Sequence, residues 1–220
     1  MIPKLTSFLV PIFLLTSTIV SSQQSHFGAF YSYGAHFNFH SSNKNPARPQ
    51  DGSAAGIYYQ LDNDTKALGF RASLAWRWND VMWKLNDVAF ILNRSNAVEL
   101  KLQCTLRLSP KNHVALGMAP RIVSHSGFAI GYKSSSNGTA VEEIHEVAGI
   151  KGDLNELNSA LCASWYHTFN RYMSFGLHLD QDMLPAYSSS VPVLVYENQP
   201  AWLTNVRLTS LTASIILNVR

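Results

Sequence analysis

The stretch SHFGAFYSYGAHFNFHSS, residues Ser25–Ser42, places two kinds of side chain on alternate positions. Its odd positions from Phe27 to Phe39 are all apolar or aromatic, whereas its even positions are mostly glycine, serine, histidine and asparagine. Because successive side chains of a β-strand point to opposite faces of a sheet, this period of two predicts a long strand with one apolar face. The fold then depends on which solvent each face meets.

The same alternation recurs in seven further stretches, of which AVELKLQCTLRL (97–108) is the clearest. There Val98, Leu100 and Leu102 share one face, and Glu99 and Lys101 share the other. The remaining stretches are 54–62, 67–78, 113–123, 157–167, 172–180 and 207–219. Most of these strands are longer than the five or six residues that are common in soluble proteins, and they match the roughly 9–11 residues of a membrane-spanning strand.

The predicted connections alternate between long and short, in the order 41–53, 63–65, 79–95, 109–112, 124–155, 168–170 and 181–205. Outer-membrane barrels have short periplasmic turns and long outer loops. The pattern therefore predicts an all-β protein, an antiparallel up-and-down transmembrane β-barrel of about eight strands. If VAFILN (88–93) and GFAIGY (127–132) are additional strands, the barrel has ten. A soluble barrel of lipocalin type would instead turn the apolar face inward and leave an exterior with little charge.

The N-terminal residues 1–22 have the layout of a cleaved secretory signal. Lys4 precedes an apolar run from Phe8 to Val20, and small residues follow. We therefore expect a single barrel domain over 23–220, exported to the outer membrane of a Gram-negative bacterium; an uncleaved anchor is the alternative. The chain has 14% charged residues and a formal charge of +3. Without a basic patch interleaved with aromatic residues, nucleic acid is not a predicted partner.

In this interpretation the apolar face meets lipid and the other face lines the lumen. Seven charged side chains then project inward as a structural polar cluster: Arg71, Arg77, Glu99, Lys101, Arg107, Arg121 and Asp180. Antiparallel pairing of the third and fourth strands brings Arg77 near Glu99. An eight-stranded barrel is only wide enough for its side chains to fill the inside, so we expect a plugged lumen. Cys104 and Cys162 face opposite ways, which argues against a disulfide.

The sequence offers little support for a catalytic, cofactor or metal site. His36, His40 and His178 face inward, but no HxH or HExxH motif occurs, so no metal is predicted. Ser124, His125 and Ser126 suggest a hydrolase dyad, yet adjacent residues on a strand point to opposite faces, and we expect a turn or loop there. No cofactor and no catalytic residue are predicted.

The strand pattern over about residues 25–220 resembles the PorT-like "outer membrane protein beta-barrel" family, the small outer-membrane barrels of Bacteroidetes-type bacteria. The resemblance is carried by AVELKLQCTLRL with HVALGMAPRI, by SALCASWYHTFNRYMSFGLHLD, and by the final LTSLTASIILNVR. It implies a small barrel in the outer membrane. The functions of this family are diverse, so the resemblance implies no particular one.

The expected function is that of an integral, non-enzymatic outer-membrane barrel with a structural or partner-binding role. Membrane lipid is the expected surrounding, and an envelope protein would bind through the connections 41–53, 124–155 and 181–205. The first alternative is a small porin-like channel or transport barrel. The second is an outer-membrane enzyme that modifies lipid, similar to a lipid A deacylase.

Overall fold

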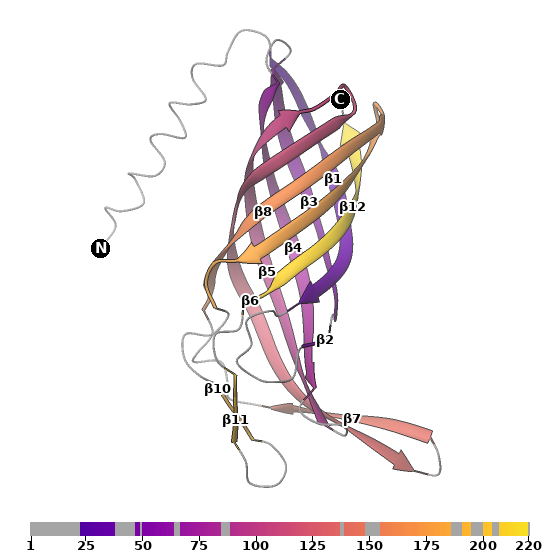
Figure 1. Ribbon diagram of the computed structural model, residues 1–220, viewed down its shortest axis with the longest axis vertical. Helices are drawn as coiled ribbons and strands as arrows, with labels where there is room; N and C mark the ends of the chain where they lie inside the picture. Colours follow the sequence, from indigo (N-terminus) through magenta and orange to yellow (C-terminus); the bar gives the residue numbers. More distant parts are fainter. Residues whose placement is uncertain are drawn as a thin grey trace, which may run out of the picture.

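The computed structural model describes residues 23–37, 47–48, 50–63, 67–84, 89–136, 139–147, 155–185, 191–194, 200–203 and 207–219 (Figure 1). The predicted signal segment 1–22 lies outside these residues. Eight long strands form the barrel: β1 (Gln23–Phe37), β3 (Gln50–Asn63), β4 (Leu68–Lys84), β5 (Ala89–Arg107), β6 (Asn112–Ser136), β8 (Leu157–Asn170), β9 (Met173–Asp182) and β12 (Thr209–Val219).

Each of these strands pairs antiparallel with the next, and β12 pairs with β1, from Phe27 opposite Val219 to Phe37 opposite Thr209. The sheet is therefore closed, and the prediction of an eight-stranded antiparallel up-and-down barrel is confirmed. Closure gives every barrel strand a hydrogen-bonded neighbour on both sides, which removes the exposed edges of an open sheet.

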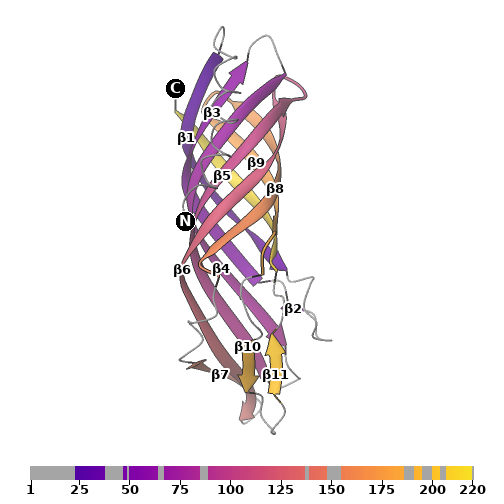
Figure 2. The ribbon, with the colours of Figure 1, turned by 90° about the vertical axis from the view of Figure 1, so that its left-hand side faces the viewer.

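The two ends of the barrel differ in their connections. The start of β1, the end of β12 and the short turns after β3, β5 and β8 lie at one end, here called the turn end (Figures 1 and 2). The opposite end, here called the long end, carries four short strands: β2 (Ala47–Arg48) beside β4, β7 (Thr139–Val147) beside β6, and the hairpin of β10 (Val191–Leu194) and β11 (Pro200–Leu203).

All seven predicted connections contain strand residues, and the largest differences are in the long ones. The connection 79–95 is wrong because β4 and β5 stay paired as far as Lys84 opposite Phe90. The connection 124–155 is wrong in its first part, where β6 continues to Ser136 and turns back into β7. In 41–53, Ala47–Arg48 form β2 and the residues from Gln50 belong to β3. The connection 181–205 contains the end of β9 together with β10 and β11, and the predicted turn 168–170 lies within β8. Continued strand pairing beyond the barrel proper satisfies backbone donors and acceptors that a loop would leave to water.

This extension also decides between eight and ten strands. The described part of 88–93 lies within β5, and 127–132 lies within β6, where the two segments pair with each other. They lengthen existing strands and add none. The register between β5 and β6 shifts between Asn96 and Ala97, which leaves Ser124 as an extra residue of β6. The expected turn at Ser124–Ser126 is therefore a bulge within a strand.

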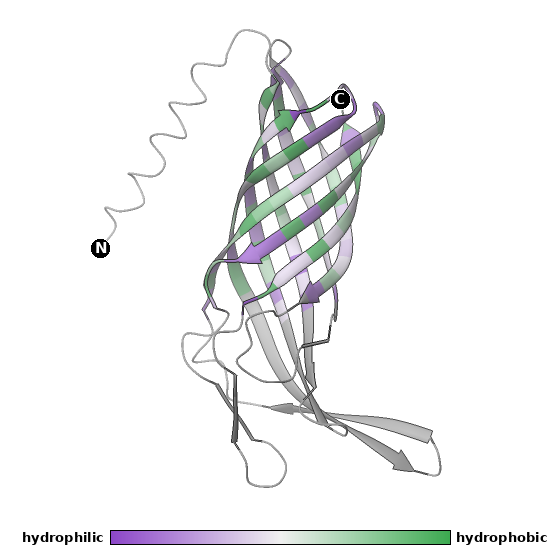
Figure 3. Ribbon diagram, in the orientation of Figure 1, coloured by the Kyte–Doolittle hydropathy of each residue, from purple (hydrophilic) through white to green (hydrophobic). Residues whose placement is uncertain are grey.

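Hydrophobic and hydrophilic residues alternate along the barrel strands (Figure 3), and the two faces of the barrel differ in character. Large apolar side chains cover the outside, and most of those on the strands are two-fifths or more exposed; examples are Ile57, Leu74, Leu116, Leu161 and Ile215. Most of the buried side chains are polar or charged. The apolar face therefore points outward, as predicted, and the inward-facing arrangement of a lipocalin does not occur.

Aromatic side chains lie on the outer surface toward both ends of the barrel. Trp76 and Trp78 are partly exposed and contact each other edge to face at 6.3 Å. At the turn end, exposed Phe27, Phe169 and Tyr172 lie on the outer surface. Among the described residues, no helix is long and apolar enough to cross a membrane.

Candidate functional site in the barrel lumen

Six charged side chains meet in the lumen, in the half of the barrel toward the long end. These residues, here called the charge cluster, are Arg77 of β4, Glu99 and Lys101 of β5, Arg121 of β6, and Asp180 and Asp182 of β9. All six are buried. Three cations face three anions, so the cluster is formally neutral.

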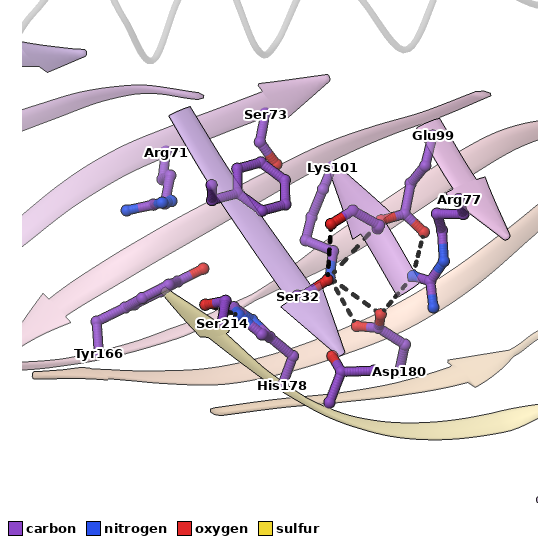
Figure 4. A pocket seen from close by; sticks show the side chains of 13 residues that line it. Ser32, Arg71, Ser73, Arg77, Glu99, Lys101, Tyr166, His178, Asp180 and Ser214 are labelled. Atoms are coloured by element: carbon purple, nitrogen blue, oxygen red, sulfur yellow. Dashed lines mark hydrogen bonds and ion pairs between the residues drawn. The ribbon is translucent and has the colours of Figure 1, made fainter. Parts of the chain in front are cut away.

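Asp180, which is 1% exposed, accepts hydrogen bonds from two cations (Figure 4). Arg77 Nη1 donates to Asp180 Oδ2 at 2.8 Å, and Lys101 Nζ donates to the two carboxylate oxygens at 2.9 and 3.0 Å. The strands β4, β5 and β9 are thus linked across the lumen. Charge-assisted bonds of this kind are stronger than bonds between neutral groups.

Glu99 and Arg121 complete the cluster on the other side. Glu99 Oε2 accepts from Arg77 Nη1 at 2.7 Å and from Arg121 Nε at 2.5 Å, and Arg121 Nη1 donates to Asp182. Since each buried charge has partners of opposite sign, the cost of removing it from water is offset. The predicted proximity of Arg77 and Glu99 is therefore present in the structure.

Small residues on β6 and β8 make room for these long side chains. Ala119, Ala160 and Cys162 pack together in the wall of the lumen and are almost fully buried. Long side chains from β4, β5 and β9 can therefore cross the interior without steric conflict. At the long end of the cluster, Gly52 has the same effect, because a Cβ at this position would overlap the buried ring of His36.

A layer of neutral hydrogen bonds lies next to the cluster, toward the turn end. His178 bonds Ser164 Oγ at 3.0 Å through Nδ1 and Ser214 Oγ at 2.8 Å through Nε2. Gln103 Nε2 donates to Ser164, and its Oε1 accepts from Tyr166 Oη. The cavity in this region has a volume of about 20 Å³, which is close to the space of one water molecule. The side chains therefore fill the middle of the barrel.

Arg71 forms a separate layer. Its guanidinium carbon lies 3.8 Å from the ring centre of Tyr58 and 4.3 Å from that of Tyr166, so the cation is held between two aromatic rings. Arg71 Nη1 donates to Gln60 Oε1 at 2.9 Å. Cations are attracted to the faces of aromatic rings, which compensates part of the desolvation of Arg71.

Beyond Arg71 the lumen widens into a cavity of about 210 Å³, here called the cup. The cup opens at the turn end, where the exposed turn residues Pro110 and Arg171 line it. Its other lining residues include His26, Asp62 and Arg107. Asp62 accepts two 2.9 Å hydrogen bonds from Gln60 Nε2 and lies 3.7 Å from His26 Nε2.

The seven predicted interior residues all lie on the lumen side of the barrel, but they do not form one group. Arg77, Glu99, Lys101, Arg121 and Asp180 belong to the charge cluster. The structure places Arg71 in the tyrosine layer and Arg107 in the wall of the cup.

The predicted polar cluster omitted Asp182 and Asp62, although the alternation in 54–62 places Asp62 on the inward face. The predicted seventh strand ended at Asp180, although the alternation of inward positions continues for two more residues and would have identified Asp182.

The residues considered for metal or catalytic chemistry are dispersed. His36 and His178 are buried in the lumen, as predicted; they lie on β1 and β9, which β12 separates. His40 lies outside the described residues, and only the backbone is described for Ser124–Ser126. Across the described part of the chain, no group of three or more His, Cys, Asp or Glu side chains could hold a metal ion. Cys104 is exposed and Cys162 is buried, and both are free thiols.

No protein-family model matches the chain, and no curated protein matches it. Three solved structures are similar in fold. Ail, the attachment invasion locus protein of Yersinia pestis, in complex with the heparin analogue sucrose octasulfate, is 7% identical over 90% of this chain and 100% of its own, with a TM-score of 0.45. Neisserial surface protein A is 8% identical over 90% and 99%, with a TM-score of 0.38.

The third structure is the outer membrane protease OmpT from Escherichia coli, which is 7% identical over 89% of this chain and 94% of its own, with a TM-score of 0.28. Because the identities and TM-scores are low, we transfer no function from these three proteins.

Proposed function

We propose that the protein is an integral outer-membrane β-barrel without catalytic activity, which has a structural or partner-binding role. The observation that carries this proposal is the apolar exterior of a closed sheet. Along β5 the outward positions from Val98 to Leu106 are apolar or cysteine, a stretch of the length that a tilted membrane strand needs, about 9–11 residues. In hydrocarbon all backbone polar groups need internal partners, which a closed barrel provides.

The filled lumen favours a structural role over transport. The charge cluster and the layer around His178 occupy the middle of the barrel, where the cavity volume is about 20 Å³. A water-filled path for ions would require that the three cations and three anions separate. This cluster supports a rigid, non-conducting barrel, as expected for eight strands.

The long end is the favoured surface for a partner. There β4, β5 and β6 continue as paired strands beyond the barrel, and β7 adds to β6 (Figure 1). The predicted partner-binding connections are 41–53, 124–155 and 181–205. Parts of each of them lie outside the described residues. Membership of the PorT-like family stays a prediction on the strength of the strand pattern alone.

Membrane insertion can be tested by two measurements on the same preparation. We expect the protein to fractionate with the outer membrane and to migrate differently on a gel before and after boiling. Spin labels at Leu102 and Lys101 then test the orientation: oxygen dissolved in lipid should reach the label at 102 and be excluded from that at 101. Recovery in the soluble periplasmic fraction, or the reverse accessibility, would refute the proposal.

The transport alternative is tested by conductance in planar bilayers. We expect no stable open channel for the wild-type barrel, because its lumen is filled. Steady single-channel currents would exclude the non-conducting role. For the lipid-modifying alternative, a His125→Ala variant should leave lipid A acylation unchanged, and a change would support an enzyme.

A further inference from the structure

The floor of the cup at the turn end carries the buried cation of Arg71. Arg71 is only 5% exposed, and among the residues whose side chains are described no carboxylate forms an ion pair with it. Its hydrogen-bond acceptor is the neutral amide of Gln60, and its other neighbours are the rings of Tyr58 and Tyr166. A guanidinium has five N–H donors, and the hydrogen bond to Gln60 uses one of them.

The side chain of Arg71 also borders open space in the lumen. Arg71 lines both the small central cavity and the cup, which places it at the boundary between a filled lumen and an open one. On the central side the cavity of about 20 Å³ has room for little more than one water. The cup, with about 210 Å³, has room for a small ligand together with water.

The described lining of the cup has more basic than acidic residues. Arg71, Arg107 and Arg171 line it, and Asp62 is the acidic residue among its described lining residues, so the formal charge is +2 with neutral histidines. Asp62 is itself engaged by Gln60 and lies near His26. A concave surface with charge of one sign concentrates the opposite charge from solution.

We propose that the cup binds an oxyanion, a carboxylate or a phosphate group, against the guanidinium of Arg71. The planar fork of N–H donors matches the oxygen atoms of either group, and Tyr58 and Tyr166 hold the fork in place before the ligand arrives. Arg171 at the rim attracts the anion. In an outer-membrane barrel the turn end, and with it the cup, faces the periplasm; this orientation rests on the proposed function. Anion binding itself depends only on the folded barrel.

The proposal is tested by calorimetric titration of the full folded barrel in detergent with inorganic phosphate and, separately, with acetate. Sodium chloride at equal ionic strength is the control. We expect saturable binding of at least one of the two anions, and the comparison identifies the preferred group. If neither anion binds more tightly than chloride, the proposal is wrong.

Variants locate the site. Arg71→Met keeps a long apolar side chain between the two rings and should weaken binding at least about tenfold, since the lost hydrogen bonds are charge-assisted. Arg171→Gln removes an exposed cation and should weaken binding less than about threefold. Equal affinity of Arg71→Met and wild type, or equal losses in the two variants, would overturn the assignment.

A second variant guards against misfolding of Arg71→Met. Gln60→Glu places a carboxylate where the amide oxygen now lies, 2.9 Å from Arg71 Nη1, and so supplies an internal counter-ion; it is combined with Asp62→Asn, so that two carboxylates do not face each other at 2.9 Å. We expect it to weaken binding of the added anion at least about tenfold while the barrel stays folded, as judged by its migration before boiling. Unchanged binding in this combined variant would overturn the proposal. Conductance, by contrast, would refute the proposed function and leave the binding result intact.

Discussion

The lumen accommodates buried cations in two different ways. In the charge cluster, Arg77, Lys101 and Arg121 face an equal number of carboxylates at hydrogen-bond distance. Toward the turn end, Arg71 lies between two tyrosine rings and has one neutral acceptor. Both regions exclude most water, but only in the charge cluster are the cations paired with carboxylates.

The difference shows how one narrow lumen can be filled by side chains at the charge cluster and still contain an open cup at the turn end. Mutual ion pairs bind β4, β5, β6 and β9 to one another, so no member of the cluster can leave without exposing a buried charge of the opposite sign. Aromatic faces hold a cation without neutralising it, so Arg71 keeps donors and a charge for a ligand. We therefore expect the cluster to dominate stability and the tyrosine layer to dominate binding.

The largest effect is expected for Asp180→Asn. The substitution keeps the shape of the side chain but removes the anion that faces Arg77 and Lys101, which leaves buried positive charge without compensation. The free energy of unfolding should fall by about 3–5 kcal/mol. Urea unfolding in detergent, followed by the gel shift, measures it. Exposed Glu156→Gln is the matched control and should unfold as the wild type does; equal behaviour of both variants would contradict a stabilising cluster.

A double variant tests whether the cluster acts as a unit. Lys101→Met combined with Asp180→Asn removes one charge of each sign and restores neutrality. The double variant should be less destabilised than the sum of the single variants by about 0.5–3 kcal/mol. The same unfolding experiment gives all four values. Simple additivity would mean that Lys101 and Asp180 contribute independently despite their 2.9 Å contact.

Substitution of Tyr58 separates the two contributions of this ring. Tyr58→Phe removes the hydroxyl that donates to Asn218 Oδ1 at 2.5 Å and should lower the free energy of unfolding by about 0.5–1.5 kcal/mol. Tyr58→Leu also removes the ring beneath Arg71 and should lower it by a further roughly 0.5–2 kcal/mol. Identical unfolding of the Phe and Leu variants would show that the ring does not stabilise the cation.

The smallest effect on stability is expected for Arg71→Met, because no buried anion is left unpaired when the guanidinium is removed. Its free energy of unfolding should stay within about 1 kcal/mol of the wild type, since a methionine packs well between aromatic rings. Arg77→Met, measured in parallel, should lose about 3–5 kcal/mol. If the two arginine variants were equally unstable, the contrast between the two regions would be wrong.

Period-two patterning made the barrel predictable. In Ser25–Ser42 and in 97–108 the apolar positions fall on one face for longer than a soluble strand requires, and that fixed the fold class, the outward apolar face and the inward charges. The extent of the strands was less predictable. The prediction placed a loop at 79–95, because alternation is weak there. In the structure β4 continues to Lys84 and β5 already begins at Ala89, because the two strands pair with each other. Such pairing depends on a neighbouring strand, which local sequence does not encode.

By itself, the sequence determined which side chains enter the lumen, since the pleat of a strand assigns every residue to a face. Apart from the predicted approach of Arg77 to Glu99, only the tertiary structure decided which of those side chains meet. Arg71 and Arg77 lie on one strand and share a face, yet the stagger of eight strands places one between tyrosines and the other against Glu99 and Asp180. Depth within a closed barrel depends on the register of all its strands together, so no single stretch of sequence carries that information.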